Sequence, residues 1–211
     1  MPVILEEKIF EGCGGLEMTQ EKKIVIAAYA TILILGEPAG YYPDLKAILV
    51  YPDDYVAPVH DEDEAGIMSE GVETRSGESW DMGSIVLSWA DIERDIQNPF
   101  NGRNLIFHEF AHQLDSRYGM TAGIDEMGNV HTPGEWNDLL AKSYLELQKN
   151  WERGTPTLLD TYGATHPAEF FSVATETFFE KAHAMRRKHP KLYDLLKQVY
   201  NMDPASYLPY R

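Results

Sequence analysis

The sequence has little cysteine and little positive charge. Cys13 is the single cysteine of the 211 residues, so the chain has no partner for an intramolecular disulfide and cannot build a metal site from several thiolates. This cysteine usage is typical of a reducing compartment. Lysine and arginine number 18 against 34 aspartates and glutamates, a net charge of −16. Since so acidic a surface repels phosphate backbones, we expect no direct binding of nucleic acid.

A long hydrophobic run is also missing. The longest one extends from Ile24 to Leu35 and falls short of the about 20 residues that cross a bilayer. The N-terminus carries acidic residues where a signal peptide would be apolar. We therefore expect a cytoplasmic protein that makes no use of a membrane. With 44% hydrophobic residues the chain can bury a core of its own, which predicts one domain over residues 1–211.

Short strands precede long helices in the predicted order of elements. Apolar and β-branched stretches predict strands over 45–51, 72–75 and 83–88, with a solvated loop at 52–71 and a turn at 77–79. Helical periodicity and capping residues predict helices over 20–35, 91–97, 103–118, 133–151, 167–184 and 190–200. This order is typical of an α+β fold with a small sheet and a mainly helical C-terminal half.

One motif carries clear chemistry. Residues 108–112 read His-Glu-Phe-Ala-His, the H-E-x-x-H pattern, within an apolar helical stretch. At about 100° per residue, His108 and His112 lie about 40° apart and one turn along the helix, so both imidazoles can reach one zinc ion at roughly 2.0–2.1 Å. Glu109 is displaced about 100° from His108. It borders the ion without binding it and can deprotonate a metal-bound water.

A catalytic zinc site needs a third protein ligand. A histidine six residues after the second would mark a metzincin, but position 118 is tyrosine, which excludes that class. The remaining candidates are later acids and histidines, namely Glu169, Glu176, Glu180, His131, His166 and His183. We favour Glu169, because a carboxylate in the first turn after Pro167 is stabilised as the anion that a metal requires. Glu176 shares its helix face and is either the alternative ligand or a support for one, whereas Glu180 is expected on the surface.

Two further residues are candidates near the ion. Asp115 shares the helix face of His108 and His112 and could accept the second N–H of a ligating histidine. It is equally consistent with a polar residue at a helix end. Tyr162 lies seven residues before Glu169 and carries a phenol that could donate to the oxyanion of a tetrahedral intermediate. Taken alone, Tyr162 reads as an ordinary core or surface tyrosine.

The segments His108–Asp115 and Tyr162–Phe171 together resemble the Mlc titration factor A family, which are zinc-dependent peptidases of the gluzincin type. Shorter stretches at 10–17, 41–43, 48–51, 76–80 and 86–89 extend the resemblance over nearly the whole chain. The second segment is also similar to the catalytic domain of lethal factor, whose matching tyrosine assists catalysis and whose matching glutamate binds zinc. The resemblance implies a zincin-like fold, with the small sheet packed against an active-site helix. It strengthens the roles of Tyr162 and Glu169.

These features predict a zinc metallopeptidase, aminopeptidase-like as the resemblance implies. Zinc is held by the two histidines of the motif and Glu169, Glu109 is the general base, and Tyr162 stabilises the oxyanion. An extended peptide or protein substrate is expected along a sheet edge at 83–88. The alternative is a protein that sequesters a DNA-binding repressor of the Mlc type, the partner that the resemblance implies, and keeps zinc as a structural ion.

Overall fold

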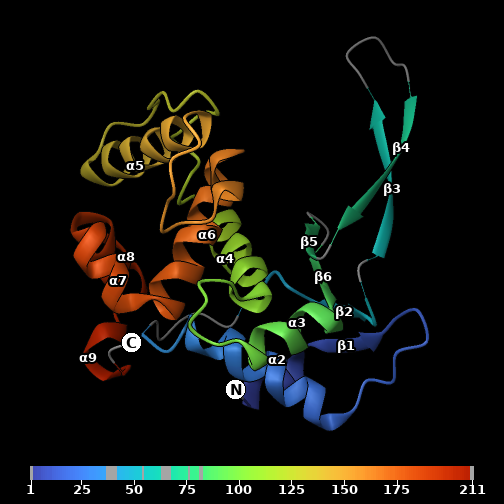
Figure 1. Cartoon of the computed structure of the whole chain (residues 1–211). Coiled ribbons are helices and arrows are strands. Elements are labelled where there is room, and N and C mark those ends of the chain that lie inside the picture. The colour runs from blue at the N-terminus through green and yellow to red at the C-terminus, as the bar shows by residue number, and fades with distance from the viewer. Residues whose placement is uncertain are drawn as a thin grey trace.

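The computed structural model arranges a set of helices beside a small sheet (Figure 1). The described residues are 2–36, 42–53, 55–62, 68–75, 77–80 and 83–209, and those between 55 and 80 are described as strand backbone only. The elements of the first half are α1 (Pro2–Glu7), β1 (Ile9–Gly12), α2 (Gln20–Ile32), β2 (Ala47–Tyr51), β3 (Tyr55–Glu62), β4 (Met68–Arg75), β5 (Gly77–Trp80) and β6 (Ser84–Ser88). Those of the second half are α3 (Trp89–Gln97), α4 (Leu105–Tyr118), α5 (Glu135–Glu152), the 3₁₀ helix η1 (Thr161–Ala164), α6 (Pro167–Glu180), α7 (Ala182–Lys188), α8 (Pro190–Tyr200) and α9 (Pro204–Tyr207).

The main sheet has four strands in the order β1-β2-β6-β5. β1 pairs with β2, and β2 with β6, in parallel, whereas β5 runs antiparallel to β6. The pairs Ile48–Ile85 and Val50–Leu87 join β2 to β6, and all four side chains are fully buried. Continuous apolar segments such as these are typical of covered parallel strands. The predicted α+β class with a small sheet is confirmed.

The strand predicted at 83–88 is confirmed as β6, but its expected position at the edge of the sheet is wrong. β6 lies between β2 and β5, so the edge strand on that side is β5. The turn predicted at 77–79 falls within β5 and is also wrong. A Gly-Glu-Ser sequence favours a turn locally, but pairing with β6 supplies the backbone hydrogen bonds that keep this segment extended.

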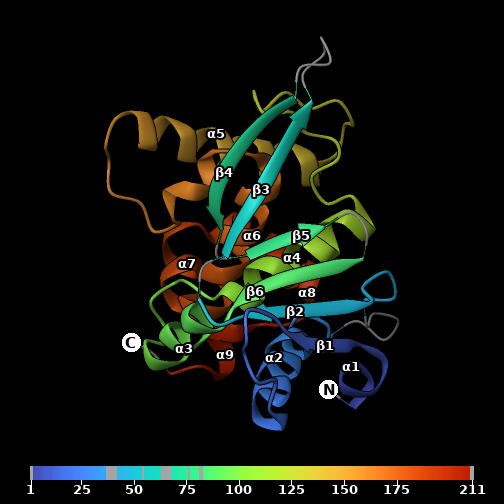
Figure 2. The ribbon, with the colours of Figure 1, turned by 90° about the vertical axis from the view of Figure 1, so that its right-hand side faces the viewer.

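The loop predicted at 52–71 is wrong over most of the part that the structure describes. β3 and β4 form a two-stranded antiparallel hairpin in which residue 55 pairs with 75 and residue 62 with 68, so the predicted strand 72–75 is the end of β4. Residues 63–67, which join the two strands, lie outside the described residues. Proline, glycine and several acids disfavour a strand locally, and backbone pairing along the hairpin outweighs that preference. Figures 1 and 2 show the hairpin extending away from the four-stranded sheet.

The predicted helices are present, with one break. The segment predicted as a single helix over 167–184 forms α6 and then α7, because Lys181 leaves the helical conformation at φ −126° and ψ 40°. Neither proline nor glycine lies at this break, so the sequence contains no local sign of it. Beyond the break α7 packs against α8. The predicted elements do not include the short elements α1, β1, η1 and α9.

Helix α6 lies within the helical half and packs against α4 (Figure 1). Phe170, Phe171 and Phe178 of α6 are fully buried. The ring of Phe107 on α4 lies 5.0 Å from that of Phe179 on α6, measured between centroids. Each buried aromatic side chain contributes about 1.5–3 kcal/mol. Since α4 also contacts β5 and β6, this burial holds α4 between the sheet and α6.

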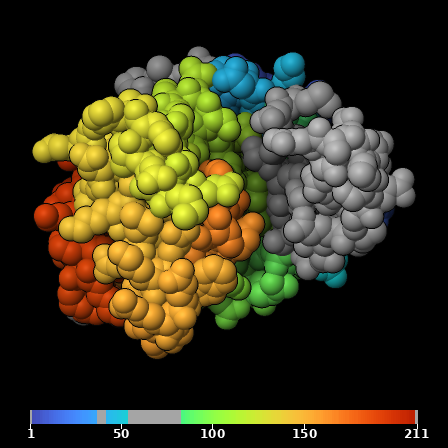
Figure 3. All heavy atoms as spheres, turned by 90° about the horizontal axis from the view of Figure 1, so that it is seen from above, coloured from blue at the N-terminus to red at the C-terminus, as the bar shows by residue number. Residues whose placement is uncertain are grey.

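In the space-filling view of Figure 3, the C-terminal part of the chain, coloured from yellow to red, gathers on one side of the molecule. The longest described helix, α5, has 18 residues and carries charged side chains in its first and last turns. Within the described ranges, no helix combines the length and the apolar character that a membrane span requires.

Candidate metal centre

Helix α4 carries the H-E-x-x-H motif and is capped at both ends. Asn104 is the N-cap, and its side chain accepts a hydrogen bond from the backbone N–H of Phe107 at 3.0 Å. Gly119 ends the helix in the left-handed conformation at φ 62°, where its N–H donates to the carbonyl of Asp115 at 2.7 Å. The apolar side of α4 faces the core, and His108 and His112 lie partly buried beside it.

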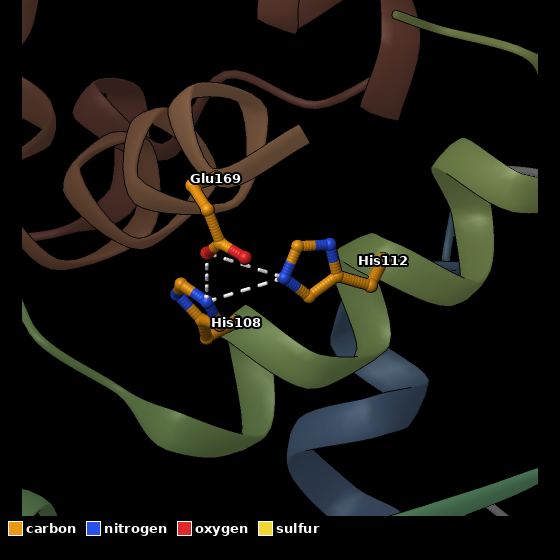
Figure 4. A group of neighbouring side chains, drawn as sticks. All are labelled: His108, His112 and Glu169. Carbon is orange, nitrogen blue, oxygen red and sulfur yellow. Dashed lines mark hydrogen bonds and ion pairs between the residues drawn. The ribbon is translucent and has the colours of Figure 1, made fainter. Parts of the chain in front are cut away.

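Helix α6 supplies a facing carboxylate from its first turn. His166 is the N-cap, because its Nδ1 accepts a hydrogen bond from the N–H of Ala168 at 3.1 Å, and Pro167 occupies the first turn. Glu169 follows, and Figure 4 shows its side chain pointing from α6 toward the two histidines of α4. His166, a rival for the third ligand position, therefore acts as a helix cap.

Three donor atoms converge between these helices (Figure 4). Nε2 of His108 lies 2.9 Å from Oε2 of Glu169 and 3.3 Å from Nε2 of His112, which is 3.4 Å from the same carboxylate oxygen. Ligands bound to a tetrahedral zinc ion at about 2.0–2.1 Å lie about 3.3 Å from one another. The three side chains therefore fit a divalent ion, and they are the group of potential metal ligands found among the described residues.

Glu176 lies behind His108 and fixes its orientation. Oε1 of Glu176 accepts a hydrogen bond from Nδ1 of His108 at 2.7 Å, and Oε2 accepts one from the backbone N–H of Asn104 at 2.7 Å. A carboxylate can only accept, so the proton of this bond is carried by Nδ1. The tautomer that suits metal binding at Nε2 is thereby selected.

The charges around the site oppose one another. Burial lowers the pKa of His108, but the hydrogen bonds that it donates to the carboxylates of Glu169 and Glu176 outweigh this effect and raise that pKa well above the ordinary value. Burial raises the pKa of Glu169, but the two histidines outweigh it and lower that pKa strongly. Glu169 therefore stays ionised, the form in which a carboxylate binds a metal.

Glu109 is almost completely buried, with 4% of its surface exposed. Burial raises its pKa to about 7, against the opposing effect of the two neighbouring histidines. Its Oε2 atom makes no hydrogen bond with any of the described residues. A buried carboxylate oxygen without a partner is costly, so this atom can accept a hydrogen bond from a group that enters the site.

Tyr162 lies beside His108. It belongs to η1, and its ring centroid is 5.9 Å from that of His108. Tyr162 is 54% exposed. The structure thus brings the phenol close to the motif and leaves it accessible to a ligand.

The other candidates lie apart from the three donors. The carboxylate of Asp115 accepts hydrogen bonds from the backbone N–H and the hydroxyl of Thr121 at 2.7 and 2.6 Å, and within the described chain it makes none with either motif histidine. Glu180 is half-buried, contrary to its expected surface position, because it accepts from the N–H of Phe100 and from Asn104. The remaining rivals are His131, which bonds Asp125, and His183, which bonds the carbonyl of Leu208.

Two residues near the site are ones that the sequence does not single out. Arg103 and Asp160 form an ion pair at 2.6 Å between the start of α4 and the start of η1. The only sequence sign of either is an aspartate two residues before Tyr162, where it can cap a short helix.

Two histidines one turn apart, with a carboxylate from a later helix in an α+β fold, are typical of metallopeptidases. The fold and the site thus define a metallopeptidase-like protein. The chain belongs to the family described as Glucose-regulated metallo-peptidase M90, whose family model matches residues 1–201. The relatives of this chain include proteins named Mlc titration factor A. The chain therefore belongs to the family that its sequence motifs resemble.

The relatives match nearly the whole chain. An uncharacterized protein from Synechocystis is 39% identical over 203 residues, which cover 96% of this chain and 74% of that protein. Mlc titration factor A from Serratia proteamaculans is 30% identical over 208 residues, or 97% and 78% of the two chains. The protein of the same name from Salmonella arizonae is 31% identical over 206 residues, or 97% and 81%.

Proposed function

We propose that the chain is a zinc-dependent metallopeptidase whose ion is held by His108, His112 and Glu169. One observation carries the proposal: donor atoms of two helices, 61 residues apart in the chain, approach one another at the spacing of zinc ligands. Two imidazoles and one carboxylate form a donor set that is typical of catalytic zinc. When bound, zinc supplies Lewis-acid chemistry, which polarises a carbonyl oxygen and lowers the pKa of water.

Glu109 would move the proton of the reaction. Its buried carboxylate follows His108 directly in the chain, and its Oε2 makes no hydrogen bond within the described residues. As general base, it would take a proton from the attacking water and pass it to the leaving amine. Tyr162, exposed beside His108, would donate its phenolic hydrogen to the oxyanion of the tetrahedral intermediate.

An extended peptide would lie along β5. This strand is at the edge of the sheet next to β6, and it contacts α4. An edge strand offers backbone N–H and C=O groups to which a peptide can pair. We therefore place the substrate along β5, where the scissile bond would come close to the histidines of α4.

The proposal is tested by measuring zinc content and peptide hydrolysis for the parent chain and Glu109→Gln. The probes are internally quenched peptides for endo-cleavage and aminoacyl coumarylamides for aminopeptidase activity. We expect Glu109→Gln to keep its zinc and to lose at least about 100-fold in kcat, since general base catalysis contributes about 10²–10⁴-fold.

The matched control is Glu135→Gln, which makes the same change at an exposed position in the first turn of α5. It should keep both zinc and activity. If Glu109→Gln binds zinc and hydrolyses either probe at the parent rate, the proposed mechanism is wrong.

A second candidate function is the capture of a DNA-binding repressor. The relatives named Mlc titration factor A favour it, and a net charge of −16 suits a partner whose surface is basic. In a pull-down with Mlc, a protein that only sequesters would bind equally well with and without Glu109→Gln.

With its single cysteine, the chain suits a reducing cytoplasm, which is the compartment that we propose.

A further inference from the structure

The backbone of Tyr162 is held on both sides, although its side chain is exposed. Oδ1 of Asp160 accepts a hydrogen bond from the N–H of Tyr162 at 3.0 Å. The carbonyl of Tyr162 accepts two from Thr165, at 3.1 Å from its N–H and at 2.8 Å from its hydroxyl. These bonds define η1, which spans only four residues. A 3₁₀ turn this short needs support from outside to hold one position.

Packing on α5 and α6 supports η1 from the helical side, and Arg103 adds a contact to α4. Its Nε and Nη2 atoms donate to Oδ2 of Asp160 at 2.9 and 2.6 Å, while Oδ1 of the same carboxylate binds Tyr162. Arg103 immediately precedes Asn104, the N-cap of α4, and lies five residues before His108. One carboxylate therefore connects the start of the helix that bears the histidines to the turn that bears the phenol.

The pair is charged and contributes little to global stability. Burial raises the pKa of Asp160, but the N–H of Tyr162 and the guanidinium of Arg103 outweigh it and hold that pKa below the ordinary value. The Arg103 side chain is 68% exposed, and ion pairs at such exposure have small effects on folding. The pair matters mainly through the position that it gives to Tyr162.

We infer that Arg103 and Asp160 are positioning residues that hold the phenol of Tyr162 beside the metal-binding helix. The inference rests on the proposed function, in which Tyr162 donates to an oxyanion. A donor of this kind works only within hydrogen-bonding distance of the oxyanion, and a displacement of about 1 Å can cost up to about 100-fold in rate. Without the pair, η1 would stay packed on α5 and α6 but lose its direct link to the start of α4, so the phenol would be held less closely.

The test is a double-mutant cycle on the zinc-loaded full chain, with the peptide probes named above. Arg103→Gln should lower kcat about tenfold and leave KM within about twofold, because the change affects the transition state more than the bound substrate. Zinc affinity and Tm should stay at the parent values. In a Tyr162→Phe background, Arg103→Gln should cause no further loss, since there is no phenol left to position.

Arg117→Gln is the matched control. Arg117 lies in the last turn of α4 and pairs with Asp44 at 3.2 Å, far along the helix from η1. The substitution Arg117→Gln removes an exposed ion pair from the same helix and should leave kcat unchanged. Arg103→Lys keeps the charge but not the forked contact, and should recover part of the lost activity.

Each outcome either supports or contradicts the inference. It is wrong if Arg103→Gln lowers kcat equally in both backgrounds, lowers zinc affinity or Tm in parallel, or leaves kcat unchanged. It also fails if Tyr162→Phe has no effect on kcat. Failure of the proposed function is seen separately, because Glu109→Gln would then retain the parent activity.

Discussion

At the scale of single residues, the hydrogen bonds that orient the donor side chains decide how well the site can hold an ion. Glu176 joins the imidazole of His108 to the backbone at the start of α4, so the ring is oriented independently of any ion. The seven-residue spacing from Glu169 places Glu176 on the same helix face. The spacing does not predict which atom Glu176 contacts, because that depends on how α6 packs against α4.

We predict that Glu176→Gln weakens zinc binding by about 10- to 100-fold, the usual cost of losing a carboxylate that orients a ligating histidine. The measurement is a competition titration against a zinc chelator. The control is Glu180→Gln, one turn later on α6, which bonds Phe100 and Asn104 but not His108. It should change the zinc affinity by less than about threefold. Equal losses in both variants would contradict the role given to Glu176.

The residues of the motif could be found from the sequence because their geometry is local. The helical repeat alone brings His108 and His112 together and places Glu109 beside them. Glu169 could be favoured but not fixed, since its approach to His108 depends on tertiary packing over 61 residues. The partner of Asp115 is a backbone N–H and hydroxyl in the following turn, which the spacing from the histidines does not predict.

At the scale of elements, the end of α4 could be predicted because the glycine that follows it is a local signal, whereas its predicted start, at 103 after Asn101 or Gly102, lies two residues too early. Gly119 bonds the carbonyl of Asp115 as expected for a helix end, and the observed N-cap is Asn104, which bonds the N–H of Phe107. The break between α6 and α7 and the β3–β4 hairpin could not be predicted in the same way. They are set by the packing of α7 on α8 and by pairing between strands, which override local preferences.

We predict that Gly119→Ala destabilises the fold by about 1–2 kcal/mol, or roughly 2–8 °C in Tm. The cost comes from the backbone, because φ is 62° there and the added Cβ would meet Ala122 at an ordinary contact of 3.4 Å. Thermal unfolding measures the change. Gly134→Ala is the control: it has open space and an extended backbone, and should cost no more than about 0.5 kcal/mol. Similar losses in the two variants would contradict this account of the helix end.

At the scale of the whole molecule, the site lies where two parts of the fold meet. α4 contacts both the sheet and α6, so the histidines are held on the sheet side and Glu169 on the helical side. An ion held by these three residues joins segments that are far apart in the chain. Its binding would therefore stabilise the folded chain as a whole, since the unfolded chain does not keep the three donors together.

We predict that zinc at about 100 times its dissociation constant stabilises the parent chain by about 2.7 kcal/mol, or roughly 5–10 °C in Tm. The measurement is thermal unfolding with and without zinc after treatment with a chelator. In His112→Ala, which lacks one donor, the shift should be almost absent. The same shift in both proteins would show that zinc acts elsewhere.

The most direct measurement is anomalous diffraction at the zinc edge from crystals of the zinc-loaded protein. The account predicts one strong peak within about 2.0–2.2 Å of Nε2 of His108, Nε2 of His112 and a carboxylate oxygen of Glu169. No peak between these side chains, or a peak that Glu169 does not reach, would contradict it.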